Sequence, residues 1–157
     1  MPPNPQASAE TKVVVDRSAN AIVMTRSFSA PREDIFAAWT LPAQVTRWWD
    51  ASGAPLAACE IDLRPGGAFR FVTQGPPDVP PFSGVYREIA PPERLVFDAM
   101  GAVGTVLLKD VGGTTLMTVS IACPSAQHLD QFLQMGVDVG TSQTLDNLVA
   151  YINAKRG

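Results

Sequence analysis

Apolar and polar residues alternate through the middle of the chain, which is the pattern of β-strands with one buried and one wet face. In residues 59–64 the apolar side chains take the odd positions and the polar ones the even positions. The same period of two returns in residues 69–71 and 117–121. Between residues 57 and 123, short runs of this kind are separated by turn signals at nearly regular intervals. We therefore expect an antiparallel meander of about six strands here.

Glycine and proline mark the turns between these strands. Gly66 and Gly67 can supply the positive φ angles that a short hairpin loop requires. Residues 101–104 and 112–114 each contain a pair of glycines and predict two further hairpin turns. Residues 75–81 contain too many prolines for a strand, so we expect a stiff surface loop there. That loop either forms one lip of an opening or is plain surface.

The segment before the meander predicts one strand and two small helices. Residues 21–28 are rich in β-branched side chains and predict the first strand, with a turn or bulge before it at residues 18–20. Pro31 then stands where a helix tolerates proline, in the first turn, and Trp39 lies on the face that this helix buries. Pro42 ends the helix and begins a second short one.

After residue 124 the hydrophobic period changes to that of a helix, and Ser125 is the predicted N-terminal cap. A terminal helix of about 20 residues is predicted by apolar positions at spacings of three and four. Those positions are Val137, Thr141, Leu145, Leu148 and Ile152. Gly136 and Gly140 lie on a flank of this stripe, where each costs about 1 kcal/mol relative to alanine in a helix interior. Either a close backbone approach or an empty space beside the helix would account for them.

Together these elements predict an α+β domain in which a long C-terminal helix covers the apolar face of a curved antiparallel sheet. We expect a single domain over residues 13–157 and a disordered tail over residues 1–12. One helix cannot fill a strongly curved sheet along its whole length, so we expect a cavity between them. Large apolar cavities are usually ligand sites.

Composition and charge narrow the class of protein. Hydrophobic residues make up 46% of the chain and charged residues 17%, which is typical of a folded globular domain. The net charge is −3 and the basic residues are scattered singly, which argues against a nucleic-acid partner. No apolar run approaches the roughly 20 residues that a membrane span needs. Cys59 and Cys123 each lie in an apolar run, as buried free thiols do, so we expect a cytoplasmic protein without a disulfide.

The titratable residues offer few candidates for chemistry. His128 is the only histidine, and neither it nor the cysteines predict a nucleophile, a metal site or a cofactor. Asp62 and Arg64 share a predicted strand face, and Glu88 ends a nearby strand. This polar network would either orient a ligand in the pocket or form a solvated ion pair outside it. Cys59 and the apolar residues that alternate with this network are expected to point inward. The alternation therefore favours a position of the polar network on the outer face of the sheet.

Aromatic and small side chains are the candidates for the wall of the cavity. Aromatic rings provide an apolar pocket with an occasional hydrogen-bonding group, although ordinary core packing also explains each residue taken alone. Small residues of the terminal helix would give the chamber a mildly polar lining. The candidate ligand-binding residues are Trp39, Trp48, Trp49, Phe69, Phe71, Phe82, Tyr86, Met117, Val119, Gly140, Thr141 and Thr144.

Five motifs in this order resemble the START-like (SRPBCC, Bet v1-like) helix-grip superfamily, and within it the family of the C-terminal domain of the Hsp90 ATPase activator. They are residues 28–42, the pair Trp48 and Trp49, and residues 62–67, 84–95 and 135–148. The resemblance implies a β-α-α-β6-α fold with a pocket beneath the long helix. It does not imply one reaction, because relatives in the superfamily bind lipids, hormones or polyketides and some are cyclases.

On these grounds we expect a module that binds a small hydrophobic or amphipathic molecule. One alternative is a cyclase- or hydrolase-type enzyme that uses Asp62, Glu88, Tyr86 or His128 as acid or base. Another is an Hsp90-type co-chaperone or other protein-interaction module, which would need an exposed apolar or acidic patch. The sequence leaves open whether two chains form a homodimer.

Overall fold

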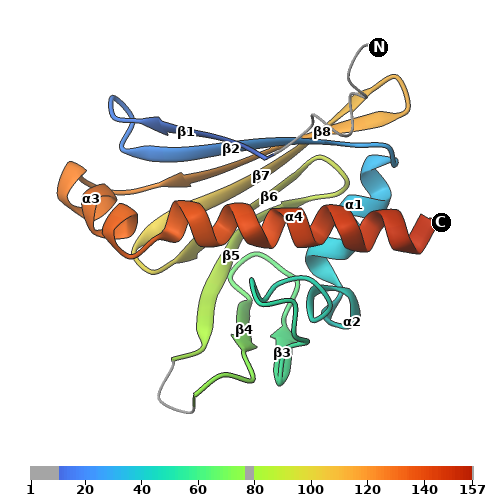
Figure 1. Ribbon diagram of the computed structural model, residues 1–157, viewed down its shortest axis with the longest axis horizontal. Helices are drawn as coiled ribbons and strands as arrows, with labels where there is room; N and C mark the ends of the chain where they lie inside the picture. The colour runs from blue at the N-terminus through green and yellow to red at the C-terminus, as the bar shows by residue number, and fades with distance from the viewer. Residues whose placement is uncertain (1–10, 77–79, 157) are drawn as a thin grey trace.

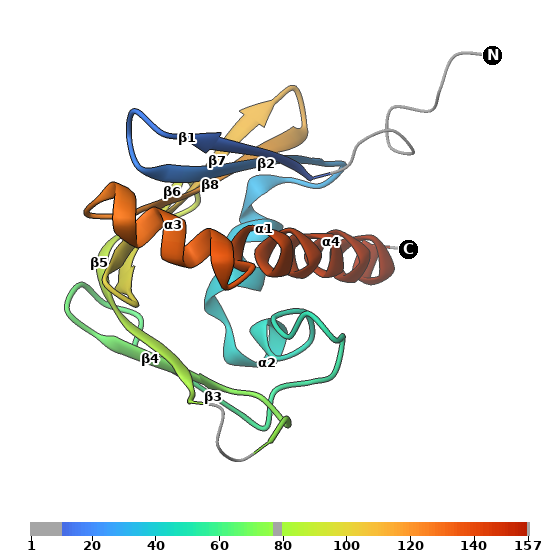
Figure 2. The same ribbon diagram turned by 60° about the vertical axis from the view of Figure 1, so that its left-hand side comes forward.

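A long C-terminal helix, α4 (Val137–Arg156), lies along the concave side of a curved antiparallel sheet in the computed structural model (Figure 1). A view turned by 60° shows this helix nearly end-on, with the strands curving around it (Figure 2). The structure describes residues 11–76 and 80–156. This arrangement is the predicted α+β helix-grip architecture, in which the sheet and the helix share one core.

The sheet has eight strands in the order β1-β2-β8-β7-β6-β5-β4-β3, and neighbouring strands are antiparallel. The strands β3 to β8 form the predicted meander, and β2 pairs with β8 at its end. The strands are β1 (Lys12–Asp16), β2 (Ala21–Phe28), β3 (Ala58–Ile61), β4 (Ala68–Val72), β5 (Phe82–Ala90), β6 (Arg94–Ala99), β7 (Ala102–Val111) and β8 (Thr114–Ala122).

Strand β1 was not predicted as a separate element. It forms a hairpin with β2, and the Asp16 carboxylate closes the turn by accepting hydrogen bonds from Oγ and N of Ser18 at 2.6 and 3.1 Å. These bonds lower the pKa of the Asp16 carboxyl, since they stabilise its charged form. The side chains of Val13, Val14 and Val15 are exposed on this edge strand, so it lacks the alternation that marks a half-buried strand.

Two predicted boundaries fall at the limits of the described residues. Of the tail predicted over residues 1–12, residues 1–10 lie outside the described part, and Lys12 already belongs to β1. The loop predicted over residues 75–81 includes residues 77–79, which also lie outside it. Within residues 11–76 and 80–156, no helix combines the length and the apolarity needed to cross a bilayer.

Two short helices follow β2, as the proline positions predict. Helix α1 (Arg32–Thr40) begins directly after Pro31, and it buries Trp39 on the face toward the core. The chain leaves the helical conformation at Leu41, immediately before Pro42, and α2 (Pro42–Val45) begins there. The residue before a proline avoids helical angles, so this break follows from local sterics.

The C-terminal part contains two helices. Ser125 caps α3 (Ala126–Gln134), with its Oγ accepting a hydrogen bond from the backbone N–H of His128 at 3.1 Å. Gly136 then adopts a φ of +77° and separates α3 from α4, so its predicted place in a helix interior is wrong. Gly140 does lie inside α4, and a Cβ added there would meet no atom within 4 Å. An open space, and no close backbone approach, therefore lies beside it.

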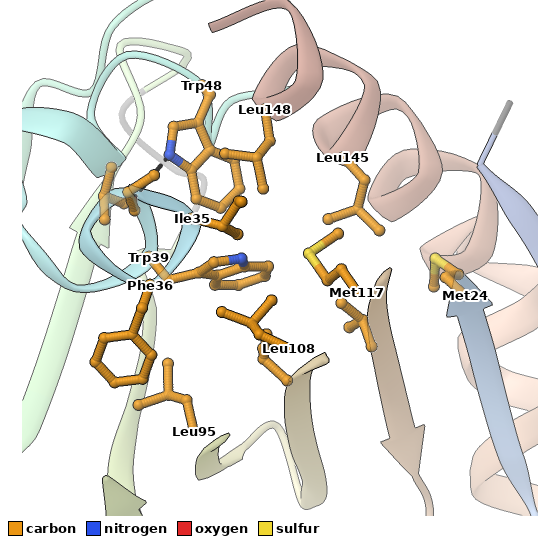
Figure 3. Close-up of a cluster of buried hydrophobic side chains, with 14 of the residues drawn as sticks. Met24, Ile35, Phe36, Trp39, Trp48, Leu95, Leu108, Met117, Leu145 and Leu148 are labelled. Atoms are coloured by element: carbon orange, nitrogen blue, oxygen red, sulfur yellow. Dashed lines mark hydrogen bonds between the residues drawn. The ribbon is translucent and has the colours of Figure 1, made fainter. Parts of the chain in front are cut away.

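The core fills the space between α1, α4 and the central strands (Figure 3). Leu145 and Leu148 of α4 are fully buried and face side chains of α1 and of the sheet. Trp48 follows α2 and is also fully buried, with Nε1 donating to the carbonyl oxygen of Ala38 at 3.0 Å. This hydrogen bond joins the segment after α2 to α1, so the two short helices form one wall of the domain.

Candidate ligand-binding site

A cavity of about 100 Å³ lies between α4 and the sheet, close to the junction of α3 and α4. The two helices contribute Phe132, Val137, Thr141, Thr144 and Leu145 to its wall. The other walls consist of Trp39, Trp49, Phe82, Phe97, Ala99, Met100, Ala102, Gly104, Val119 and Ile121. All of these side chains are uncharged, so the chamber suits a neutral apolar molecule.

Six of the predicted binding residues line this cavity. They are Trp39, Trp49, Phe82, Val119, Thr141 and Thr144. They come from α1, the segment after α2, β5, β8 and α4, and the curvature of the sheet brings these five parts together. Their role in binding stays a prediction, whereas their common location is a property of the fold.

Four further predicted residues line a separate, smaller space, which shares Trp39, Trp49, Phe82 and Phe97 with the cavity wall. Trp48, Phe69, Phe71 and Tyr86 surround a space of only about 10 Å³. Ring centroids there lie close together, at 5.2 Å for Phe69 and Phe71 and 5.1 Å for Phe69 and Tyr86. Such an aromatic stack is a solid core. These residues support the chamber and leave no room for a ligand among themselves.

Met117 and Gly140 contribute to neither space. Met117 is fully buried and packs near Leu145 beneath α4 (Figure 3). Gly140 lies on α4 outside the lining. Sequence parity places Met117 and Val119 on the same face of β8. Only Val119 borders the cavity, because the helix fills the sheet face at Met117.

Several lining residues were not among the predicted ones. Ile121 shares a face of β8 with Val119, so the period of two already pointed to it. Phe97 is in register with Gly104 on β7, and a Cβ on Gly104 would lie 2.5 Å from the Phe97 ring. The close approach of that ring depends on pairing between strands, which the hydrophobic pattern of one strand does not show.

The predicted polar network does not form as one cluster. Arg64 pairs with Asp62 at 2.9 Å, and these side chains are 73% and 51% exposed. Glu88 pairs instead with Arg94 at 3.3 Å, across the neighbouring strand β6. The reason is that β3 ends at Ile61, so Asp62 and Arg64 lie in the turn before β4 and not on a strand face. These ion pairs are solvated and lie outside the cavity wall.

The other titratable candidates are also absent from the cavity wall. Nε2 of His128 lies 3.1 Å from the carbonyl oxygen of Met100, and the His128 ring packs against Phe132. Burial raises the pKa of the Tyr86 phenol above its ordinary value, so Tyr86 stays neutral at physiological pH. Burial also raises the pKa of the Cys59 thiol to about 11, which keeps it in the unreactive protonated form.

Metal-ligand geometry is likewise not found in the described part of the chain. Among residues 11–76 and 80–156, no three side chains of His, Cys, Asp or Glu gather as a metal site would require.

Two polar groups in the cavity wall differ in their hydrogen bonding. The Thr144 hydroxyl donates to the backbone carbonyl of Trp49 at 3.1 Å, which ties α4 to the segment after α2. The buried Nε1 of Trp39 has no acceptor among the described residues. The Thr144 hydroxyl is therefore satisfied, whereas the Trp39 N–H is a buried donor without an acceptor among the described residues.

A curved eight-stranded sheet that grips one helix, with an apolar chamber beneath that helix, defines a helix-grip protein of the START-like class. The family model described as "Activator of Hsp90 ATPase homolog 1-like protein" matches residues 29–153. The chain belongs to this family, as the motifs of the sequence indicated. No sequence among the curated proteins matches the chain.

Solved structures share the fold over nearly the whole chain. A protein from Rhodobacter sphaeroides is 24% identical, with 92% of this chain and 99% of that chain covered and a TM-score of 0.82. Protein NE0264 from Nitrosomonas europaea is 20% identical, with 87% and 96% covered and a TM-score of 0.78. CalU16 from Micromonospora echinospora is 25% identical, with 95% and 88% covered and a TM-score of 0.64. These similarities establish the architecture, and the activity must be argued from the site.

Proposed function

We propose that this protein binds a small hydrophobic molecule in the cavity between α4 and the sheet. The observation that carries the proposal is the uncharged chamber of about 100 Å³. Transfer of apolar surface from water into such a space is favourable by about 25 cal/mol per Å². Binding then needs few directional contacts.

The volume sets the size of the ligand. An engineered apolar cavity of about 150 Å³ in another protein binds benzene, and sites for drug-sized ligands measure about 300 Å³ or more. A chamber of about 100 Å³ therefore suits a compact molecule of about one ring. A larger molecule would have to displace part of the wall.

The test is a thermal-shift and NMR screen with compact cyclic hydrocarbons and ketones, run against the wild-type protein and two variants. Ala102→Leu places a larger side chain into the cavity wall and should abolish the shifts seen for the wild type. Val103→Leu alters the next residue of β7, which points to the other face, and should bind as the wild type does. No response from the wild-type protein, or equal binding by Ala102→Leu, would refute the proposal.

An acid–base enzyme is less well supported by the same geometry. Asp62 and Glu88 lie in exposed ion pairs outside the cavity, and His128 bonds to a backbone carbonyl at the rim. A general acid or base must lie within hydrogen-bond reach of the reacting group. No carboxylate or histidine lines the cavity, so the wall offers no such acid or base to a bound molecule.

The family match supports a second candidate, which is a co-chaperone role. The description of the matching family names the Hsp90 ATPase, and the match covers residues 29–153. Stimulation of the turnover of an Hsp90-type ATPase by the purified protein would support this candidate. Unchanged turnover across a saturating concentration range would oppose it.

A further inference from the structure

Strand β1 has a free outer edge in the described part of the chain. It is the first strand of the sheet and pairs there with β2 alone (Figure 1 and Figure 2). An edge strand presents unpaired backbone N–H and C=O groups, and natural proteins usually protect it with a proline, a β-bulge or charged side chains. The middle of β1 has none of these, because it consists of Val13, Val14 and Val15 in regular register with β2.

The valines of β1 leave apolar surface on both faces of the sheet. Val13 and Val15 are in register with fully buried residues of β2, yet they are 37% and 36% exposed. Val14 points to the opposite face and is 54% exposed. A further strand beside β1 would cover these side chains, since cross-strand neighbours pack on each other.

The two ends of β1 carry opposite charges, Lys12 and Asp16. Both side chains lie on the face of Val14, because residues two apart in a strand share a face. Lys12 has no ion-pair partner among the described residues. Asp16 uses only Oδ1 in the turn after β1, where it accepts from Ser18, so its other oxygen is available to a cation.

The sequence of β1 is complementary to itself when two copies run antiparallel. If the two copies of Val14 lie opposite each other, Lys12 of each copy faces Asp16 of the other. Unlike charges directly across two strands stabilise the pair, whereas like charges destabilise it. A slip by two residues would place Lys12 opposite Val14 and remove both ion pairs. The charges therefore select one register, which has two-fold symmetry.

The opposite edge of the sheet differs. Strand β3 has four residues and no cation, and its Glu60 lies 3.8 Å from Arg70 of β4 in the same sheet. The charge of β3 is thus met within one chain. Of the two edges, β1 is the one with a self-complementary pattern.

We propose that two copies of this chain associate through their β1 strands, which pair antiparallel about Val14 and join the two sheets. Backbone hydrogen bonds and the covered valines supply the affinity, and the two ion pairs fix the register. Because the paired strands are five residues long, the interface is small and the dimer should dissociate on dilution. The inference is independent of the ligand proposed above, since β1 does not line the cavity.

Sedimentation equilibrium of the full chain at a series of concentrations tests the association. Lys12→Glu places like charges opposite each other at both ends of the paired strands, so it should weaken dimerisation about tenfold. Asp16→Lys should have the same effect with the opposite sign of charge. Lys109→Glu makes the same charge change as Lys12→Glu at an exposed position of β7, and it should dimerise as the wild type does.

An equimolar mixture of Lys12→Glu and Asp16→Lys is the decisive measurement. Each variant alone opposes like charges, whereas the mixture opposes unlike charges at both ends. A heterodimer should therefore form with about the wild-type affinity. Mixing would not repair a folding defect, so this recovery can only come from contact between the two chains.

Val14→Lys tests the same register without touching the turn that Asp16 closes. Val14 is exposed, so the variant should fold, and it sets two ammonium groups opposite each other at the symmetry axis. Dimerisation should be abolished. Val14→Thr keeps a β-branched side chain and should still dimerise.

Three results would overturn the proposal. One is a wild-type protein that stays monomeric at every concentration. Another is a mixture of the two folded charge variants that forms no heterodimer, or a Val14→Lys protein that dimerises like the wild type. The third is growth into assemblies larger than two, which would show pairing through the β3 edge as well.

Discussion

Nε2 of His128 lies 3.1 Å from the carbonyl oxygen of Met100, and this contact joins α3 to the turn between β6 and β7. Both sides of the contact border the cavity, since Met100 and Phe132 line it and the His128 ring packs against Phe132. Met100 adopts a φ of +54° and is 51% exposed. The hydrogen bond thus holds an unusual backbone conformation at the rim of the chamber.

Replacement of His128 by Phe tests this contact. The aromatic packing on Phe132 remains, whereas the hydrogen bond to Met100 is lost, so the free energy of unfolding should fall by about 1 kcal/mol. Urea denaturation measures the change, and Gln127→Ala at the neighbouring exposed position of α3 is the control. An unchanged unfolding midpoint for His128→Phe would show that the contact adds no stability.

Gly104→Ala should destabilise the protein through the cavity wall. An added Cβ would lie 2.5 Å from two atoms of the Phe97 ring, so that ring must move. Overpacking of this kind costs about 1–3 kcal/mol, and the displaced ring would enter the chamber. We expect a lower melting temperature together with weaker ligand binding. Wild-type binding by this variant would mean that Phe97 relaxes away from the chamber.

Gly140→Ala should have the opposite effect on stability. Gly140 is in the interior of α4, and a Cβ added there meets no atom within 4 Å. Alanine has a higher helix propensity than glycine, so the free energy of unfolding should rise by about 0.5–1 kcal/mol. Ligand affinity should not change, because Gly140 does not line the cavity. A decrease in stability would indicate that the helix needs glycine at this position.

Ionisation of the Cys59 thiol should lower the stability of the protein at alkaline pH. Its pKa is raised from 9.0 to about 11 by burial, so the unfolded chain loses this proton first as the pH rises. The contribution of the buried, protonated thiol to the free energy of unfolding is therefore complete below pH 9 and is lost as the pH passes through about 11. Urea denaturation at several pH values should show this decline, and Cys59→Ala should make it shallower. An identical decline in the variant would assign the effect to other groups, such as Tyr86, whose pKa burial also raises.

The sequence predicted most of the fold because each element has a clear hydrophobic period. The meander and α4 follow from periods of two and of 3.6, which depend on burial on one face. Strand β1 was not predicted, because Val13, Val14 and Val15 are all exposed at the edge of the sheet and show no alternation of apolar and polar side chains. Gly136 was misplaced because a glycine that ends one helix resembles a glycine inside the next.

The site was predictable only in part. Apolar residues on the inner faces of strands could be chosen by parity, and Val119 and Phe82 do line the cavity. Which aromatic residues border open space and which form solid core depends on how the sheet curves beneath α4. Nε1 of Trp39 is unsatisfied because none of its neighbours in three dimensions is a hydrogen-bond acceptor, which no spacing along the chain encodes.

The positive φ of Gly136 has a consequence for what the chamber can hold. Phe132 lies before this glycine and Val137 after it, so two separate helices, the shorter α3 and the longer α4, form that side of the wall. The shorter helix is also joined to β8 at its start, and it is anchored by the buried Leu129 and by the ion pair of Asp130 with Arg17 at 2.9 Å. A guest larger than one ring would therefore have to displace a helix that is fixed at both of its ends.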